Sequence, residues 1–138
     1  MLYMNAEKYG VIQACHFESV NEGSLLVTPD RAILTPTGQA ISSMRHHAGG
    51  MIRAIRDDVV ATEKDSTITL TLINRSYDKD KSFTIPKVGT VRSTRLLSGE
   101  GILPWSRFSE SELSVEEEGG RWSVTLPAHS IAVVRLER

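Results

Sequence analysis

The feature that most constrains the fold is a series of short alternating stretches after Gly49-Gly50. Between residues 66 and 74, apolar residues alternate with threonines, which is the two-residue period of a strand with one buried face. Residues 121–126 repeat this alternation, and residues 130–137 form a nearly continuous apolar stretch rich in β-branched side chains. These three segments predict β-strands that bury a common core.

Weaker strand candidates lie between the three clear ones, each bounded by Gly, Pro, Asp or Ser. They are residues 51–58, 82–85, 90–97 and 112–117. The total is about seven short strands with no helix between them. Parallel pairing would require a crossover of a dozen or more residues each time, so the pattern predicts a mainly β chain folded as an antiparallel, jelly-roll-like β-sandwich.

The first fifty residues have a different character. Residues 11–20 are rich in apolar side chains and predict a buried strand, and two short stretches flank a turn at Pro29-Asp30. Residues 37–47 predict a helix with Thr37 as its N-cap and Gly49 as its end. We therefore divide the chain into residues 1–50, a βα segment, and residues 51–138, the sandwich.

Size and charge exclude several classes of protein. The 138 residues suffice for one domain, whereas a closed (β/α)8 barrel takes about 250. A net charge of −1 implies neither a nucleic-acid-binding face nor a basic membrane patch. With a single cysteine, Cys15, no disulfide framework or multi-cysteine zinc site is possible within the chain, and no segment resembles a signal peptide or a membrane span. We predict a cytoplasmic protein without cofactor, although a signal in a longer protein would lie upstream.

Three segments, in order along the chain, have distinctive residue patterns: Ala14-Cys15-His16-Phe17-Glu18-Ser19-Val20-Asn21, Leu34-Thr35-Pro36-Thr37 continuing to His47 and Gly49, and Leu126-Pro127-Ala128-His129-Ser130 followed by an apolar stretch. Together they resemble glycoside hydrolase family 51, the α-L-arabinofuranosidases. The resemblance implies that residues 1–50 are the last strand and helix of a catalytic barrel. It also implies that residues 51–138 are the C-terminal sandwich packed against that barrel.

The resemblance also implies what this chain lacks. Retaining glycosidases require two carboxylates about 5 to 5.5 Å apart, and the family's two glutamates lie on earlier barrel strands, outside this chain. We therefore expect no catalysis from the chain on its own.

The same resemblance points to Glu18 and Asn21 as sugar-site contributors, because they fall at the end of the proposed last barrel strand. Glu18 replaces a glutamine of the family, and a carboxylate accepts hydrogen bonds but cannot donate them as an amide does. This departure leaves the sugar preference open. Alternatively, Glu18 is an ordinary solvated residue at a strand end.

The remaining side chains that could bind a sugar or a metal also have structural interpretations. Trp105, in a loop, can stack on a sugar or pack against a neighbouring domain, whereas Trp122 is in phase with core residues. His46 and His47 point about 100° apart on a helix, which disfavours a metal site. We expect His129 to make a structural hydrogen bond.

Three functions remain open. The first is a non-catalytic accessory domain of an arabinofuranosidase-like enzyme acting on arabinose-containing plant polysaccharides, with the barrel or a homo-oligomer as partner. The second is a stand-alone carbohydrate-binding module that uses Trp105, and the third is a purely structural interaction protein. In the first case the isolated chain should self-associate or leave its first fifty residues poorly ordered.

Overall fold

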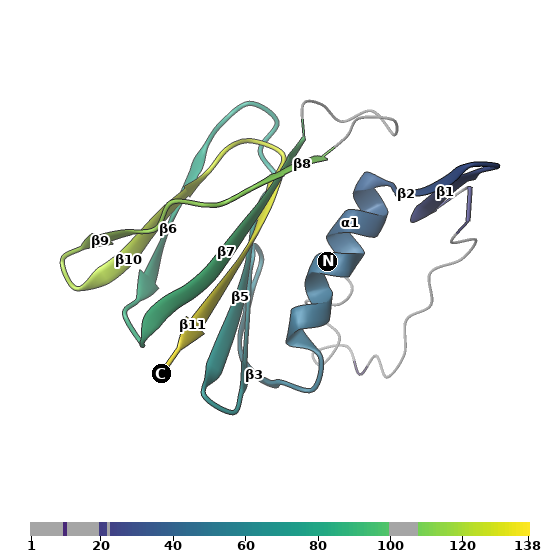
Figure 1. Cartoon of the computed structure of the whole chain (residues 1–138). Helices are drawn as coiled ribbons and strands as arrows, with labels where there is room; N and C mark the ends of the chain where they lie inside the picture. Colours follow the sequence, from purple (N-terminus) through teal and green to yellow (C-terminus); the bar gives the residue numbers. More distant parts are fainter. Residues whose placement is uncertain (1–9, 11–19, 22, 100–107) are drawn as a thin grey trace.

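The computed structural model describes residues 10, 20–21, 23–99 and 108–138. In this part of the chain, a β-hairpin and a short helix precede nine further strands (Figure 1). The elements are β1 (Leu25–Thr28), β2 (Arg31–Leu34), α1 (Pro36–Ser43), the 3-10 helix η2 (Met44–His47), β3 (Met51–Arg56), β4 (Val59–Lys64), β5 (Thr67–Asn74), β6 (Lys81–Pro86), β7 (Thr90–Gly99), β8 (Phe108–Ser111), β9 (Glu116–Glu118), β10 (Arg121–Leu126) and β11 (Ser130–Glu137).

The nine later strands form two facing sheets. A six-stranded sheet has the order β3-β4-β5-β11-β7-β8, and a three-stranded sheet has the order β6-β10-β9. All neighbouring strands within the sheets are antiparallel. The predicted mainly β, antiparallel sandwich is confirmed.

The core lies between the two sheets, and its residues come from the alternating positions of the predicted strands. In the register of β5 and β11, Leu70 is opposite Val134 and Ile68 is opposite Leu136, and all four side chains are buried. Phe83 and Val124, paired between β6 and β10, belong to the same cluster from the facing sheet. Burying one such side chain contributes roughly 1.5 to 3 kcal/mol, so this cluster holds the two sheets together.

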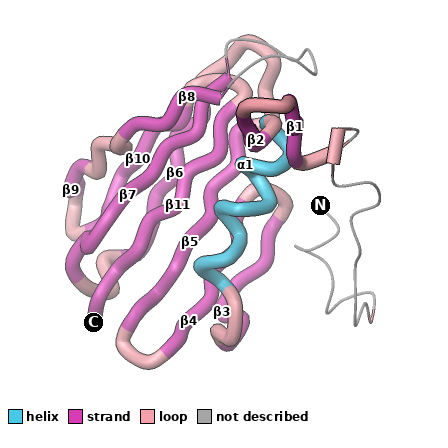
Figure 2. The backbone as a smooth tube through the Cα atoms, turned by 45° about the vertical axis from the view of Figure 1, so that its right-hand side comes forward, coloured by secondary structure: helices cyan, strands magenta, loops and turns pink. Residues whose placement is uncertain are grey.

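The opposite face of the six-stranded sheet is covered by α1 and η2, so the molecule has three layers where the helix crosses (Figure 2). The sequence alternation of β5 predicted one buried face and one solvated face, and this is wrong. Thr71 is 0% exposed and Thr69 is 3% exposed. Their hydroxyls lie under η2, where Thr69 Oγ1 donates a hydrogen bond to the His46 carbonyl. Hydrogen bonds with η2 satisfy these buried hydroxyl groups.

The helix begins earlier than predicted. Thr35, and not Thr37, is its N-cap, because the Thr35 Oγ1 atom accepts a hydrogen bond from the Gly38 N–H at 3.2 Å. Pro36 then takes the first helical position, where its missing N–H costs nothing. The regular α-helix ends at Ser43, and the last turn tightens into η2.

Two further expectations about strands are corrected. The segment predicted as one strand at residues 51–58 is β3 followed by a turn, and the following β4 was not predicted, because Asp57 and Asp58 reverse the chain between them. The candidate at residues 112–117 is not a single strand. Leu113 is buried but lies between β8 and β9, where its N–H and carbonyl bond the Thr94 hydroxyl instead of a neighbouring strand.

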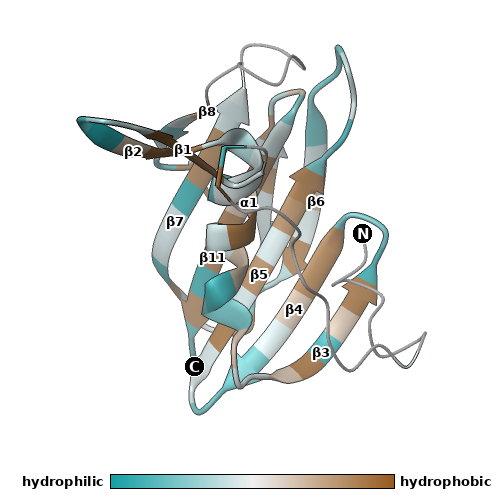
Figure 3. Ribbon diagram, turned by 90° about the vertical axis from the view of Figure 1, so that its right-hand side faces the viewer, coloured by the Kyte–Doolittle hydropathy of each residue, from teal (hydrophilic) through white to brown (hydrophobic). Residues whose placement is uncertain are grey.

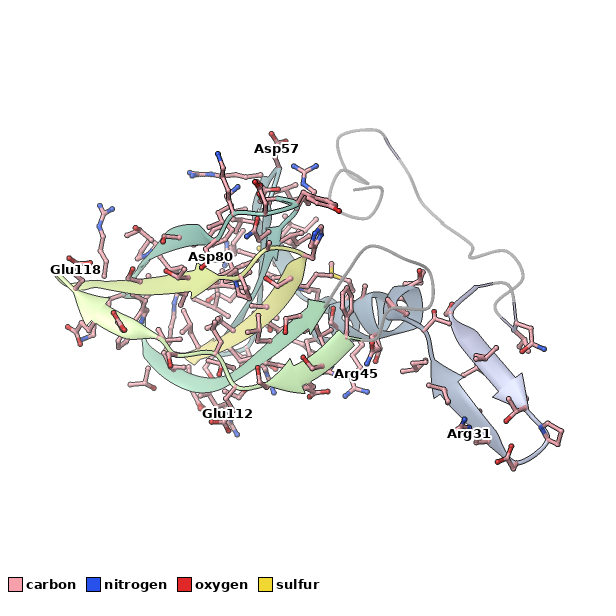
Figure 4. The ribbon with its side chains drawn as sticks, turned by 90° about the horizontal axis from the view of Figure 1, so that it is seen from above. Arg31, Arg45, Asp57, Asp80, Glu112 and Glu118 are labelled. Carbon is pink, nitrogen blue, oxygen red and sulfur yellow. The ribbon has the colours of Figure 1, made fainter. Side chains whose placement is uncertain are left out.

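The hairpin β1–β2 projects from the rest of the molecule, with Arg31 near its tip, far from the sandwich (Figure 4). Its base is nevertheless fixed to the helix. The Thr35 N–H donates to the Ser24 carbonyl at 2.9 Å, and the Thr35 Oγ1 donates to the Gly23 carbonyl at 2.8 Å. A Cβ atom on Gly38 would lie 2.1 Å from the Ser24 oxygen. The hairpin and helix therefore form one rigid unit.

Candidate functional site

Of the three predicted sugar-site residues, only Asn21 lies among the described residues. Its backbone has a φ of 63°, and its N–H donates to the Leu25 carbonyl at 2.6 Å. The Asn21 Oδ1 atom accepts a hydrogen bond from the Val27 N–H at 2.8 Å. The side-chain oxygen thus shapes the turn before β1, and its role in binding sugar stays a prediction. Glu18 and Trp105 lie outside the described residues, and their predicted roles also stay predictions.

The two neighbouring histidines of η2 connect the helix to the sheet. The His47 Nδ1 atom lies 2.9 Å from the Thr62 Oγ1, and its Nε2 atom lies 2.7 Å from the Thr71 Oγ1. A neutral imidazole offers one donor and one acceptor, and hydroxyls satisfy either. Burial, and next the nearby His46, lower the pKa of His47 from 6.5. His47 is therefore a neutral clamp between the two layers, with both ring nitrogens occupied.

The predicted structural role of His129 is carried by its backbone. His129 has a φ of 51°, its N–H donates to the Ser76 carbonyl at 3.2 Å, and its carbonyl accepts from the Gly99 N–H. Its ring packs edge-on against Tyr77, with the ring centroids 5.1 Å apart. The tail motif that begins at Leu126 is thus the turn that leads into β11.

Large exposed apolar side chains gather on the hairpin–helix unit. We call this set the docking surface: Val20, Leu26, Val27, Leu34 and Ile41. Val20 is 52% exposed and Leu34 is 46% exposed. Apolar residues are drawn in brown on β1 and β2 in Figure 3. In the register of the hairpin, Leu26 lies on one face and Val27 and Leu34 lie on the other. Exposed apolar side chains gathered on one unit are candidates for protein contact.

The depressions lined by described residues include the following three. One is apolar, about 350 Å³, and lies beside β6 where the smaller sheet ends. A second, about 580 Å³, includes Trp122. The face of Trp122 is covered by Lys87, whose Nζ lies 5.0 Å from the ring centroid, and the ring packs on the core. Trp122 is therefore no free sugar platform, which agrees with its predicted place beside the core.

The third depression, about 430 Å³, is polar and lies next to η2. Sequence reasoning missed it, because its residues come from η2, β7, β8 and β11, which are far apart along the chain. No group of three or more His, Cys, Asp or Glu side chains able to hold a metal occurs in the described ranges. None of the described helices is long and apolar enough to cross a membrane.

Solved structures of glycoside hydrolases share this fold. A family 51 α-L-arabinofuranosidase from Bifidobacterium longum superposes with a TM-score of 0.76 at 18% identity, over 99% of this chain and 33% of that one. The chain has a fold found within family 51 arabinofuranosidases. The family 51 enzyme from Xanthomonas axonopodis pv. citri matches at a TM-score of 0.64 and 18% identity, over 86% of this chain and 30% of its own.

The sequence comparisons and one further solved structure complete the comparison with known proteins. No family description and no curated protein matches the sequence. The catalytic domain of a family 30 xylanase from Talaromyces cellulolyticus shares the fold at a TM-score of 0.53 and 15% identity, over 86% of this chain and 29% of that one. This chain thus spans about a third of the arabinofuranosidases it resembles, and the same fold accompanies more than one sugar specificity.

Proposed function

We propose that this chain is a non-catalytic accessory domain of an α-L-arabinofuranosidase-like glycoside hydrolase. In this role it stabilises the catalytic barrel or the oligomer that the barrel forms. The observation that carries the proposal is the docking surface, which lies outside the sandwich core on a rigid hairpin–helix unit. On an isolated sandwich these leucine and valine side chains stay exposed to water, which is unfavourable, whereas a domain packed on a barrel buries them.

The position of the docking surface supports the same role. The hairpin–helix unit lies on the opposite side of the six-stranded sheet from the smaller sheet (Figure 1). Its helix is fixed to the sheet by His47 and by Gln39, whose Nε2 donates to the Phe108 carbonyl. The hairpin is therefore fixed to the sandwich through the helix. This is the arrangement expected of a domain that holds a neighbour in place.

The whole enzyme, by this proposal, acts on arabinose-containing plant polysaccharides. The support is the likeness to two arabinofuranosidases over about a third of their chains. Glu18 and Asn21 would edge its sugar site, as the sequence resemblance implies. The two catalytic carboxylates would belong to the barrel.

A hybrid enzyme tests the docking role. The matched third of the Bifidobacterium longum arabinofuranosidase is replaced by this chain, and the same enzyme without that third is the control. The hybrid should hydrolyse an aryl α-L-arabinofuranoside and unfold at a higher temperature than the shortened enzyme. A hybrid no more stable or active than the shortened enzyme would contradict the proposal.

The isolated chain tests the non-catalytic part. Incubated with the same aryl arabinofuranoside, it should give no turnover above that of the uncatalysed reaction. Measurable hydrolysis that disappears in a Glu18→Gln variant would show that the chain carries catalysis of its own.

A further inference from the structure

The two sheets of the sandwich differ in width, and the smaller one ends at β6. The larger sheet has six strands and the smaller has three, in the order β6-β10-β9. β6 pairs with β10 on one side, and no described strand pairs with it on the other side. An edge strand presents unpaired N–H and C=O groups, which are a template for a further strand.

The apolar depression of about 350 Å³ lies along this edge, and we call it the edge groove. Four successive residues of β6 line it, of which Phe83 and Ile85 are buried whereas Thr84 and Pro86 are exposed. Because side chains of a strand alternate between its two faces, a groove that touches all four runs along the edge of β6. Its opposite wall is formed by the larger sheet and is mainly apolar.

The charged residues of the edge groove are accessible and mostly basic. They are Arg53, Arg56, Glu63 and Arg138. Arg53 and Arg138 both bind Glu63, at 2.6 and 2.8 Å, and their side chains are 51% and 55% exposed. Arg56 is exposed and forms no ion pair with a described residue. Three guanidinium groups face one carboxylate, and the balance stays positive when the main-chain carboxylate of Arg138 is counted.

We propose that an extended, acidic segment of the parent enzyme, lying outside these 138 residues, adds to β6 as a further strand and covers the edge groove. Its backbone pairs with the edge of β6, and its apolar side chains enter the groove at every second position. A carboxylate at one end of the segment binds Arg56. The inference rests on the proposed function for the source of this segment, since the chain spans about a third of the arabinofuranosidases it resembles.

A second copy of this chain, paired along β6, fits the edge groove less well. β6 begins at Lys81, is followed by Lys87 and contains no acidic residue. Two copies paired in this way would bring their lysines and the arginines of both grooves together, and like charges at an interface repel. Charge therefore favours an occupant whose sequence differs from that of β6.

The site is tested first on the 138-residue chain with a synthetic peptide. The probe is acetylated, amidated Glu-Thr-Val-Thr-Val-Thr-Glu, whose valines and glutamates share one face when it is extended. Backbone amide NMR signals are followed during the titration. We expect saturable shifts in β6 in the millimolar range, with slower hydrogen exchange there. A peptide with lysines in place of the glutamates, and one of the same composition without the alternation, should both bind more weakly.

Two matched substitutions test the role of the basic residues. Arg56→Glu should weaken binding of the glutamate peptide about fivefold or more, because an attraction becomes a repulsion. Arg31→Glu makes the same change at an exposed arginine near the tip of the hairpin, far from the sandwich (Figure 4), and should bind the peptide as the wild type does. Equal effects of the two substitutions, equal affinities for the three peptides, or absence of saturable binding overturns the inference.

The hybrid enzyme separates this inference from the proposed function. Amides of β6 should exchange more slowly in the hybrid than in the isolated chain. Equal exchange of β6 in a stable hybrid overturns the strand addition while the accessory role stands. Protection of β6 that rises with the concentration of the isolated chain would make a second copy the occupant and overturn the assignment. A hybrid that is unstable removes the proposed function, and with it the assigned source of the segment, whatever the peptides show.

Discussion

Asn74 shows how a single buried residue joins two parts of the sandwich. Its side chain is 2% exposed. The Asn74 Nδ2 atom donates to the carbonyls of Lys79, Leu126 and Pro127 at 2.8, 3.0 and 2.9 Å, and its Oδ1 accepts from the Ser76 N–H. The loop after β5 is thereby tied to the turn between β10 and β11.

Replacing Asn74 by Ala should therefore reduce the free energy of unfolding by about 2 to 4 kcal/mol, because several buried backbone groups lose their partner. Asn74→Asp should be at least as harmful, since a carboxylate would face carbonyl oxygens without a proton to donate. Urea unfolding followed by circular dichroism measures both. A loss below about 0.5 kcal/mol for both variants would mean that water replaces the amide fully.

The sequence predicted which apolar residues are in the core, but it did not predict the surroundings of the polar residues on the same strands. Alternation correctly placed Leu70 and Val124 in the core, and the nearly continuous apolar stretch at residues 130–137 correctly placed Val134 there. It misassigned Thr71, because a periodic pattern does not reveal that a helix covers the polar face. Arg135 falls within the strand predicted at residues 130–137, and only the register of β11 with its neighbours brings it beside η2.

At the scale of elements, η2 is fixed to the sheet by a histidine whose charge state depends on pH. The folded-state pKa values of His46 and His47 are both lowered from 6.5. Their neutral forms therefore stabilise the fold fully above pH 6.5, and this contribution is lost as the pH falls through the folded-state values.

We expect the free energy of unfolding to decrease between pH ~7.5 and pH ~5.5. The lowered pKa of Asp58, caused mainly by its hydrogen bond with Lys81, acts only at more acidic pH and does not interfere. Urea unfolding at several pH values measures this slope, and His47→Gln should make it shallower. An identical slope in wild type and variant would refute the assignment of the clamp to His47.

Some boundaries of helices and strands could be predicted from the local sequence and others could not. The Pro29-Asp30 turn was predicted correctly, and the two short stretches that flank it, which were not assigned as strands from the sequence, are β1 and β2. The helix start was placed two residues late, because Thr35 and Thr37 are both capable caps and only Thr35 precedes Pro36. The strand β4 was not predicted, because the turn Asp57-Asp58 before it contains no glycine and is a weaker sequence signal of a hairpin.

At the scale of the whole molecule, the docking surface determines how the isolated chain behaves. Its exposed apolar side chains should drive weak self-association when no barrel covers them. Sedimentation velocity over a concentration series should show this, and Leu26→Asp should shift the chain toward monomer. Val88→Asp, at an exposed apolar residue outside the docking surface, is the matched control. Equal effects of the two substitutions would show that the hairpin is not the contact.

The fold class and the family 51 likeness were both predictable from the sequence, because they rest on strand periodicity and on three ordered segments. The division at residue 50 stays a prediction, as do the sugar-site roles of Glu18, Asn21 and Trp105. The docking surface was not predicted residue by residue, because exposure depends on how the hairpin sits on the helix.

The most direct test of the account is amide hydrogen exchange on the hybrid enzyme and on the isolated chain. If the hairpin–helix unit docks on a barrel, amides of β1, β2 and α1 should exchange more slowly in the hybrid, while those of β11 in the sandwich core remain unchanged. Equal exchange of the hairpin and helix amides in the two proteins would contradict the accessory-domain account.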